Sequence, residues 1–420
     1  MDTITHGIAG ALIGKAFFAG EEHRTDSSHG FTRINTDHKQ DRDPPDGGAL
    51  PRAPAGQRPA LQARIAVGAA TLGAIFPDSD IVAEVFDSRN IALLELHRGF
   101  THSFVCLPAF ALGLAGLTRW YARRRGWACP SWQRLTLIYG VGIALHIFLD
   151  LITSFGTMIW SPISNHRAAL DTNFIIDFLM TGSLLVPQMA AWVFRQKRGF
   201  APRATFSWTL LSFAAVAIER LARAVGFGFS PWAVVVIAVL LALVFLAPAR
   251  KDWGFSVSRA TWCRAGVVVF AAYLGLSGAA QIVARGRVKD FAASRGLAVE
   301  RLAALPLPPS PLVWSGMIRT PDGVWRAQFR LFDHSPAKYD FFADSPTNTY
   351  ITEAEALPTV KIYLWFARFP SVHYEERGGL HDVEFSDLRF FTRPGRSHPF
   401  AYRVRFDGAG KVVEQGWVVE

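Results

Sequence analysis

Long apolar stretches separated by short polar segments are the dominant pattern along this chain of 420 residues. A helix that crosses a bilayer needs roughly 17–25 mostly apolar residues. Eight stretches approach this length, and they lie at residues 3–20, 61–76, 104–120, 135–155, 174–194, 206–218, 232–247 and 265–284. The pattern therefore predicts an α-helical polytopic membrane protein with about eight spans.

Beyond residue 284 the long apolar stretches give way to short ones. Residues 324–332 and 359–369 have the composition of β-strands. Residues 400–406 and 411–419 flank a short Asp- and Gly-containing segment, which predicts a hairpin. We therefore expect a transmembrane helical domain over residues 1–284 and a small β-rich domain over residues 285–420.

Residues 21–60 interrupt the helical domain after its first apolar stretch. The segment is rich in Asp, Arg, Gly and Pro, a composition that is typical of a disordered chain. We interpret it as a tolerated insertion without a function of its own.

The basic residues predict an orientation in the membrane. The net charge is +10, and Arg and Lys concentrate in three alternate loops, at residues 119–134, 195–203 and 250–264. The positive-inside rule places these loops, and with them the insertion, in the cytoplasm. The intervening loops and the β-rich domain then lie outside it. Because topology accounts for the charge, nucleic acid is not an expected partner.

One polar cluster lies inside the fourth apolar stretch. His146 and Asp150 are four residues apart and share a helix face with Thr153. Ionisable groups within a span are costly and usually face partners or a cavity. Imidazole and carboxylate at this spacing can hold a divalent metal ion. A structural hydrogen bond between packed helices explains this pair equally well when it is considered alone.

Three further clusters fall at the same expected membrane face. Taken singly, each is explained by helix-terminal turn chemistry or by a water-facing loop. Together with His146 and Asp150 they bring four histidines and three aspartates to one depth, which favours a metal site. The three clusters hold His6, then Asp78 and Asp80, then His97, Arg98, Thr101 and His102. Asp171 and Asp177, in the next outward loop, are expected to be solvated.

Each candidate residue has an expected role. Asp80 would accept a proton from water and Arg98 would stabilise negative charge, with Thr101 as a third catalytic candidate. Mixed nitrogen and oxygen ligands fit zinc, with manganese or iron as alternatives. The expected metal ligands are His6, Asp78, Asp80, His97, His102, His146 and Asp150.

Four motifs resemble the YdjM/YbcI family of membrane-bound metal-dependent hydrolases. They read ITHGIAGALIG, FPDSD, HRGFTHS and LHIFLDLITSFGTMIWSP. The specific part is HRGFTHS followed by HxxxDxxTxxG, which ends at Gly156. The resemblance covers residues 2–177 apart from the insertion. It implies a multi-pass protein of a bacterial-type inner membrane with hydrolase activity, and its polar motifs carry over to all the candidate residues named above.

The sequence thus predicts a membrane-bound metal-dependent hydrolase that acts near the outer membrane face. Membrane lipids are the expected partners, and a lipid or lipid-linked phosphoester is the expected substrate. A metal-ion or proton-coupled transporter is an alternative, because intramembrane His and Asp also mark ion pathways. A metal-stabilised envelope scaffold is another. Transporters often carry inverted repeats, and none is evident in the sequence, which favours the enzyme.

Overall fold

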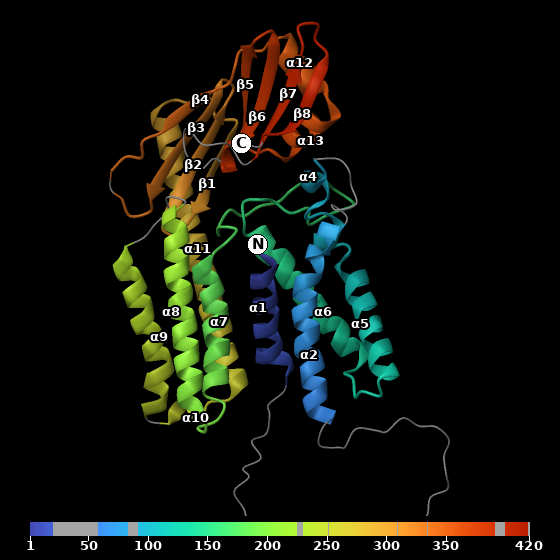
Figure 1. Ribbon diagram of the computed structural model, residues 1–420, viewed down its shortest axis with the longest axis vertical. Coiled ribbons are helices and arrows are strands. Elements are labelled where there is room, and N and C mark those ends of the chain that lie inside the picture. Colours follow the sequence, from blue (N-terminus) through green and yellow to red (C-terminus); the bar gives the residue numbers. More distant parts are fainter. Residues whose placement is uncertain are drawn as a thin grey trace, which may run out of the picture.

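The computed structural model describes residues 1–19, 58–82, 91–224, 230–250, 252–308, 310–333, 335–390 and 400–418. A bundle of helices carries two β-sheets at one end (Figure 1). The expected insertion at residues 21–60 lies almost wholly outside the described residues, so its disorder and its place in the cytoplasm stay predictions.

The bundle is built from the apolar stretches that the sequence predicts, and all eight are helical over most of their length. Short 3-10 or π segments continue some helices. The elements are α1 Thr3–Ile13, η1 Gly14–Phe18, α2 Arg58–Ile75, η3 Phe76–Asp80, α4 Ala92–Leu96, η4 Phe100–His102, α5 Leu107–Arg124, α6 Trp132–Leu151, α7 Phe178–Val193, α8 Phe200–Ala224, α9 Pro231–Arg250, α10 Trp253–Ser256 and α11 Arg259–Ser294.

Four of these helical segments are long and apolar enough to cross a membrane, at Pro59–Asp80, Trp132–Leu151, Trp232–Arg250 and Arg259–Ser294. Ala92–His102 and Leu107–Arg124 form a pair bent by 73°, which makes a fifth candidate if the pair is one broken span. The described residues therefore contain four or five candidate spans. The remaining spans of the expected eight stay predictions.

The longest helix, α11, joins the bundle to the sheets. It begins at a cap in which the Ser258 side chain accepts a hydrogen bond from the Thr261 amide, and it has 36 residues. At 1.5 Å per residue it is about 54 Å long, whereas the hydrocarbon core of a bilayer is about 30 Å thick. Its last turns pack Ala284 and Val288 against Trp314 of the first sheet. Helix α11 therefore anchors the first sheet of the β-rich part to the bundle.

The β-rich part contains two four-stranded antiparallel sheets, with strand orders β1-β2-β3-β4 and β5-β6-β7-β8. Helices α12 Thr349–Ala356 and α13 Pro358–Phe366 pack on the second sheet. The strands are β1 Arg301–Leu307, β2 Val313–Thr320, β3 Gly323–Arg330, β4 Asp340–Ala343, β5 Pro370–Arg377, β6 Leu380–Asp387, β7 Ala401–Phe406 and β8 Val412–Trp417.

Two strand predictions are confirmed and one is wrong. The strand expected at 324–332 is β3, and the expected hairpin is β7 with β8. Residues 359–369 are not a strand, because most of them form helix α13. Its buried Val360, Tyr363 and Phe366 are three apart, so they line one helix face against the second sheet. Packing on that face outweighs the strand-like composition of the segment.

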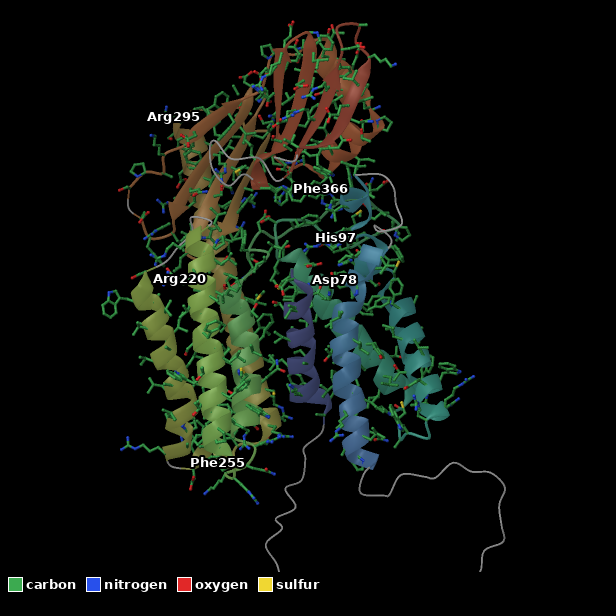
Figure 2. All side chains as sticks on the ribbon, in the orientation of Figure 1. Asp78, His97, Arg220, Phe255, Arg295 and Phe366 are labelled. Atoms are coloured by element: carbon green, nitrogen blue, oxygen red, sulfur yellow. The ribbon has the colours of Figure 1, made fainter. Side chains whose placement is uncertain are left out.

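The polar clusters lie at the end of the bundle that faces the sheets. Figure 2 shows Asp78 and His97 at this end, whereas Phe255, in the basic segment 250–264, lies at the opposite end. The structure thus places the clusters and the β-rich part on one side of the bundle. Which side faces the cytoplasm stays a prediction.

Candidate metal centre

Three short breaks in helix geometry bring the polar clusters together. Pro77 turns the end of α2 into the 3-10 segment η3, which carries Asp78 and Asp80. His97 ends α4 in an extended conformation, and Arg98 has a left-handed φ of 61°. The chain then enters η4, which ends at His102. These turns point side chains from three separate segments at helix α6.

His146 has a defined proton position. Its Nδ1 lies 2.7 Å from the Ala74 carbonyl oxygen, which can only accept, so Nδ1 donates. In the neutral ring the lone pair is therefore on Nε2. This atom lies 3.3 Å from Asp78 Oδ1 and 3.5 Å from Asp150 Oδ2. A lone pair that faces two carboxylates is unfavourable unless a cation or an added proton lies between them.

His102 is oriented in the same way from the opposite side. Asp80 Oδ2 lies 3.2 Å from its Nδ1, and a carboxylate there favours a proton on that nitrogen. The His102 Nε2 atom then faces Asp150 Oδ2 at 3.1 Å and His146 Nε2 at 3.0 Å. Nitrogen lone pairs and carboxylate oxygens thus converge on one region.

Asp150 is the centre of the cluster and is fully buried. Its Oδ1 lies 3.0 Å from Arg98 Nη2 and 3.3 Å from His6 Nε2, and the α-ammonium group of Met1 also contacts it. The His6 ring stacks on His146 at a centroid distance of 3.6 Å. The positively charged groups beside Asp150 Oδ1 offset part of the free-energy cost of burying the negative charge of this carboxylate.

Several of these atoms are buried without a hydrogen bond. Among the described residues, His6 Nδ1, His6 Nε2 and Asp150 Oδ2 have no hydrogen-bond partner. Atoms of His6, Asp78, His146 and Asp150 nevertheless lie within 4.8 Å of one another. Buried polar atoms are normally hydrogen-bonded. Polar atoms that lie close together without bonding to each other are arranged to share a partner between them. Imidazole nitrogens and carboxylate oxygens together would suit a divalent cation as that partner.

Asp80 lies next to this group of atoms and contacts the residues that surround it. Its Oδ1 is 3.2 Å from His97 Nδ1, and its Oδ2 accepts from the Arg98 amide at 2.9 Å. Thr101 Oγ1 lies 3.4 Å from Asp80 Oδ2 and 3.0 Å from His102 Nδ1. Asp80 and Thr101 therefore orient the two imidazoles, and Asp80 lies outside the group of converging ligand atoms.

The Arg98 guanidinium contacts other groups of the protein. Besides Asp150, it donates from Nη1 to Thr153 Oγ1 at 2.9 Å. It also lies over the Phe155 ring, 4.9 Å from the centroid. The observed contacts fix Asp150, and the expected action of Arg98 on a substrate stays a prediction.

The structure thus brings together all nine residues that the sequence singled out, and their individual roles stay predictions. The β-rich part contributes neighbours that the sequence reasoning did not identify. Phe155 packs against Phe366 of α13 at 5.0 Å, and Arg389 donates to the Ser154 carbonyl oxygen at 2.7 Å. These residues lie more than two hundred positions from Phe155, so no local signal links them.

Two carboxylates expected to be solvated are buried. Asp171 accepts two hydrogen bonds from Arg368, both at 2.7 Å, and Asp177 accepts from Tyr273 at 2.6 Å. Their exposed fractions are 5% and 4%. The expectation was wrong because the β-rich part and α11 cover the loop that carries them.

Gly156, the last position of the HxxxDxxTxxG motif, is required by the backbone. Its φ is +91°, and a Cβ there would lie 3.1 Å from Arg167 Cβ. Arg167 in turn donates to the carbonyl oxygens of His97 and Gly156, at 2.9 and 3.1 Å. The glycine therefore lets the loop after α6 pass close to the candidate centre.

Comparisons with known proteins bear on the motifs. Residues 46–221 match the family model described as YdjM inner membrane protein. The matched range contains every candidate residue except His6. Neither a curated protein nor a solved structure matches the chain. The resemblance that the motifs predict is therefore confirmed over residues 46–221, where the chain is similar to the YdjM inner membrane protein family.

Proposed function

We propose that this chain is a membrane-bound metal-dependent hydrolase whose catalytic centre lies between the helical bundle and the β-sheets. The observation that carries the proposal is the tautomer of His146. Its Nδ1–H group donates a hydrogen bond to the Ala74 carbonyl oxygen, so the lone pair on its Nε2 atom faces the carboxylates of Asp78 and Asp150. Such an arrangement is stabilised by a cation at that place.

His6, Asp78, His146 and Asp150 would hold the metal, with His102 Nε2 as a further ligand atom. Nitrogen and oxygen ligands together fit zinc, and also manganese or iron. A bound divalent ion supplies Lewis-acid activation of water and of the bond to be cleaved.

A His–Asp pair beside the ligands is suited to proton transfer. Asp80 Oδ1 lies 3.2 Å from His97 Nδ1, a contact that orients the imidazole ring. The His97 side chain is 18% exposed, whereas those of His6, His102 and His146 are fully buried. The His97 imidazole would accept the proton of the attacking water, and Asp80 would hold the ring and stabilise the imidazolium. This assignment replaces Asp80 as the direct base.

Arg98 would act through Asp150. Its guanidinium donates to Asp150 Oδ1 and Thr153 Oγ1, which fixes the carboxylate that lies between the imidazoles. A rigid carboxylate keeps the ligand atoms in place during turnover.

The first experiment is the metal content of the detergent-purified protein by elemental mass spectrometry. Near-stoichiometric metal is expected in the wild type and in a control that carries His373→Ala and Asp407→Ala on the β-rich part. It should be lost in the still-folded double variant His146→Ala with Asp150→Ala. Equal trace metal in all three proteins, after purification without chelators and attempted reloading, would exclude the metal centre.

Hydrolysis is tested separately with metal-loaded protein and a panel of phosphoester and lipid-ester substrates. Turnover that His97→Gln abolishes without loss of metal is the expected result. Absence of turnover from a metal-replete protein across the panel would favour the transporter or the scaffold.

A further inference from the structure

We propose that a groove along helix α1 binds one acyl chain of a membrane lipid and presents the head of that lipid to Asp78. The proposal rests on the proposed hydrolase function for the fate of the lipid. It adds the class of molecule and the path by which it reaches the centre.

The groove lies on the face of α1 between α2 and α7, which flank α1 in Figure 1. Its volume is about 360 Å³, within the range of roughly 300–1,000 Å³ that small-molecule sites occupy. Its floor includes Gly7 and Ala11, and its walls include Ile75 of α2 and Leu185 of α7. Apolar residues that line the middle of the groove favour a hydrocarbon chain there.

The upper end of the groove reaches the candidate metal centre. Thr3 lines the groove, and its Oγ1 donates to Asp78 Oδ2 at 2.6 Å. The other oxygen of Asp78 lies 3.3 Å from His146 Nε2. Asp78 is only partly buried, in contrast to Asp150. A chain in the groove therefore ends beside the carboxylate through which the buried centre is approached.

Polar groups lie at the lower end of the groove. Gln188 lines it, donates to the Ile8 carbonyl oxygen at 3.0 Å and accepts from Lys15 Nζ at 2.8 Å. From Thr3 to Ala11 the helix rises about 12 Å. An apolar length of that size between two polar ends fits the upper part of one acyl chain, with the remainder in the bilayer.

The chemistry of the lining also argues against an extended peptide as the occupant. Such a peptide would bury unpaired backbone N–H and C=O groups against apolar side chains. An acyl chain has no polar backbone to satisfy.

The test uses a phosphatidylglycerol with a diazirine on its palmitoyl chain, incorporated in phosphatidylcholine nanodiscs with the full-length protein. After irradiation, adducts are mapped by peptide mass spectrometry. They should concentrate on α1 and α7 rather than on the lipid-exposed α9. Ala11→Phe fills the groove and should lower the α1 and α7 adducts about tenfold, a size typical of overpacking.

Two further variants separate groove filling from misfolding. Leu185→Phe fills the groove from the opposite wall and should have the same effect. Ala272→Phe makes the matched change at an exposed position of α11 and should leave the adducts unchanged. Adducts spread over all helices according to their exposure, and insensitive to both filling variants, would overturn the proposal.

Metal content measured on the same samples keeps the two proposals apart. A metal-replete protein without groove adducts would contradict the proposed acyl-chain site and would still support the metal centre. Groove adducts in a protein that binds no metal would support the lipid site and remove the hydrolase.

Discussion

The Nε2 atoms of His102 and His146 lie 3.0 Å apart, and each ring is held from behind by an oxygen acceptor at its Nδ1 side. For His146 the acceptor is the Ala74 carbonyl, and for His102 it is the Asp80 carboxylate. Two neutral imidazoles fixed in this way cannot donate to each other. The pair therefore needs a cation or an added proton between its Nε2 atoms, and it depends on the groups that fix the rings.

Asp80→Asn tests this dependence. An amide cannot accept on both sides, so it would support His97 or His102 but not both, and the metal affinity should fall about 10–100-fold. Competition with a fluorescent zinc chelator in detergent measures the change.

Asp382→Asn is the matched control, because Asp382 lies in the second sheet and pairs with Arg405. Wild-type affinity in Asp80→Asn would mean that the ring orientation is set by the backbone alone.

Metal binding should also stabilise the fold. A ligand present at about 100 times its dissociation constant adds about 2.7 kcal/mol to the free energy of unfolding, provided the unfolded chain does not bind it. Adding zinc to stripped protein should therefore raise the melting temperature, and chelator should reverse the rise. Asp150→Ala should melt at the same temperature with and without zinc. A zinc-dependent rise in that variant would place the stabilising ion elsewhere.

The sequence indicated which residues to consider for the candidate centre more readily than it indicated their arrangement. Histidine and aspartate are expensive in apolar stretches, so His6, His146 and Asp150 were conspicuous. Which of them touch was not predictable, because the contacts join segments far apart in the chain. Nor could the sequence show which residues converge on the centre and which, such as Asp80 and Thr101, only orient their neighbours. That difference depends on the turn at Arg98.

The β-rich part shows why composition failed there. Strand β3 has strand-like composition, and β7 and β8 flank a short Asp- and Gly-containing turn, so all three strands were predicted. Helix α13 has strand-like composition, but Pro358 begins it and its apolar residues recur three apart. That spacing was visible in the sequence. The burial of Asp171 was not, because its partner Arg368 comes from the β-rich part, almost two hundred residues further along the chain.

Gly156 provides a test of the loop after α6. Gly156→Ala forces a residue with a Cβ to adopt φ near +91° against Arg167, and a strained residue of this kind costs about 1–3 kcal/mol. A lower melting temperature is expected. Gly182→Ala, within α7 and with open space around the position, should be neutral or slightly stabilising because alanine favours helices. Equal effects of the two substitutions would argue against the strained loop.

The second sheet should be sensitive to acid through Asp382. Hydrogen bonds from Arg405, at 2.7 and 3.0 Å, hold the pKa of the Asp382 carboxyl below its ordinary value. A carboxyl whose pKa is lower in the folded state stabilises the fold above its unfolded pKa of about 3.9, and that contribution is lost as the pH falls through the folded value.

The comparison is between wild type and Asp382→Asn. The wild type should melt at the higher temperature at pH 7, and the difference should shrink as the pH falls below about 4. A difference that does not vary with pH would assign the effect to packing.

The pair Arg368–Asp171 fixes the sheets to the loop that leads from the candidate centre. Both guanidinium nitrogens donate to the carboxylate at 2.7 Å, and Asp171 is 5% exposed. Removing one partner of a buried pair leaves the other charge unpaired, at a cost of about 2–5 kcal/mol. Arg368→Ala should therefore loosen residues 156–177, and hydrogen exchange there should become faster. Arg403→Ala removes the more exposed pair with Glu384 and should change little. Faster exchange confined to the second sheet in Arg368→Ala would show that the sheets hold the loop by other contacts, such as Arg389 with the Ser154 carbonyl.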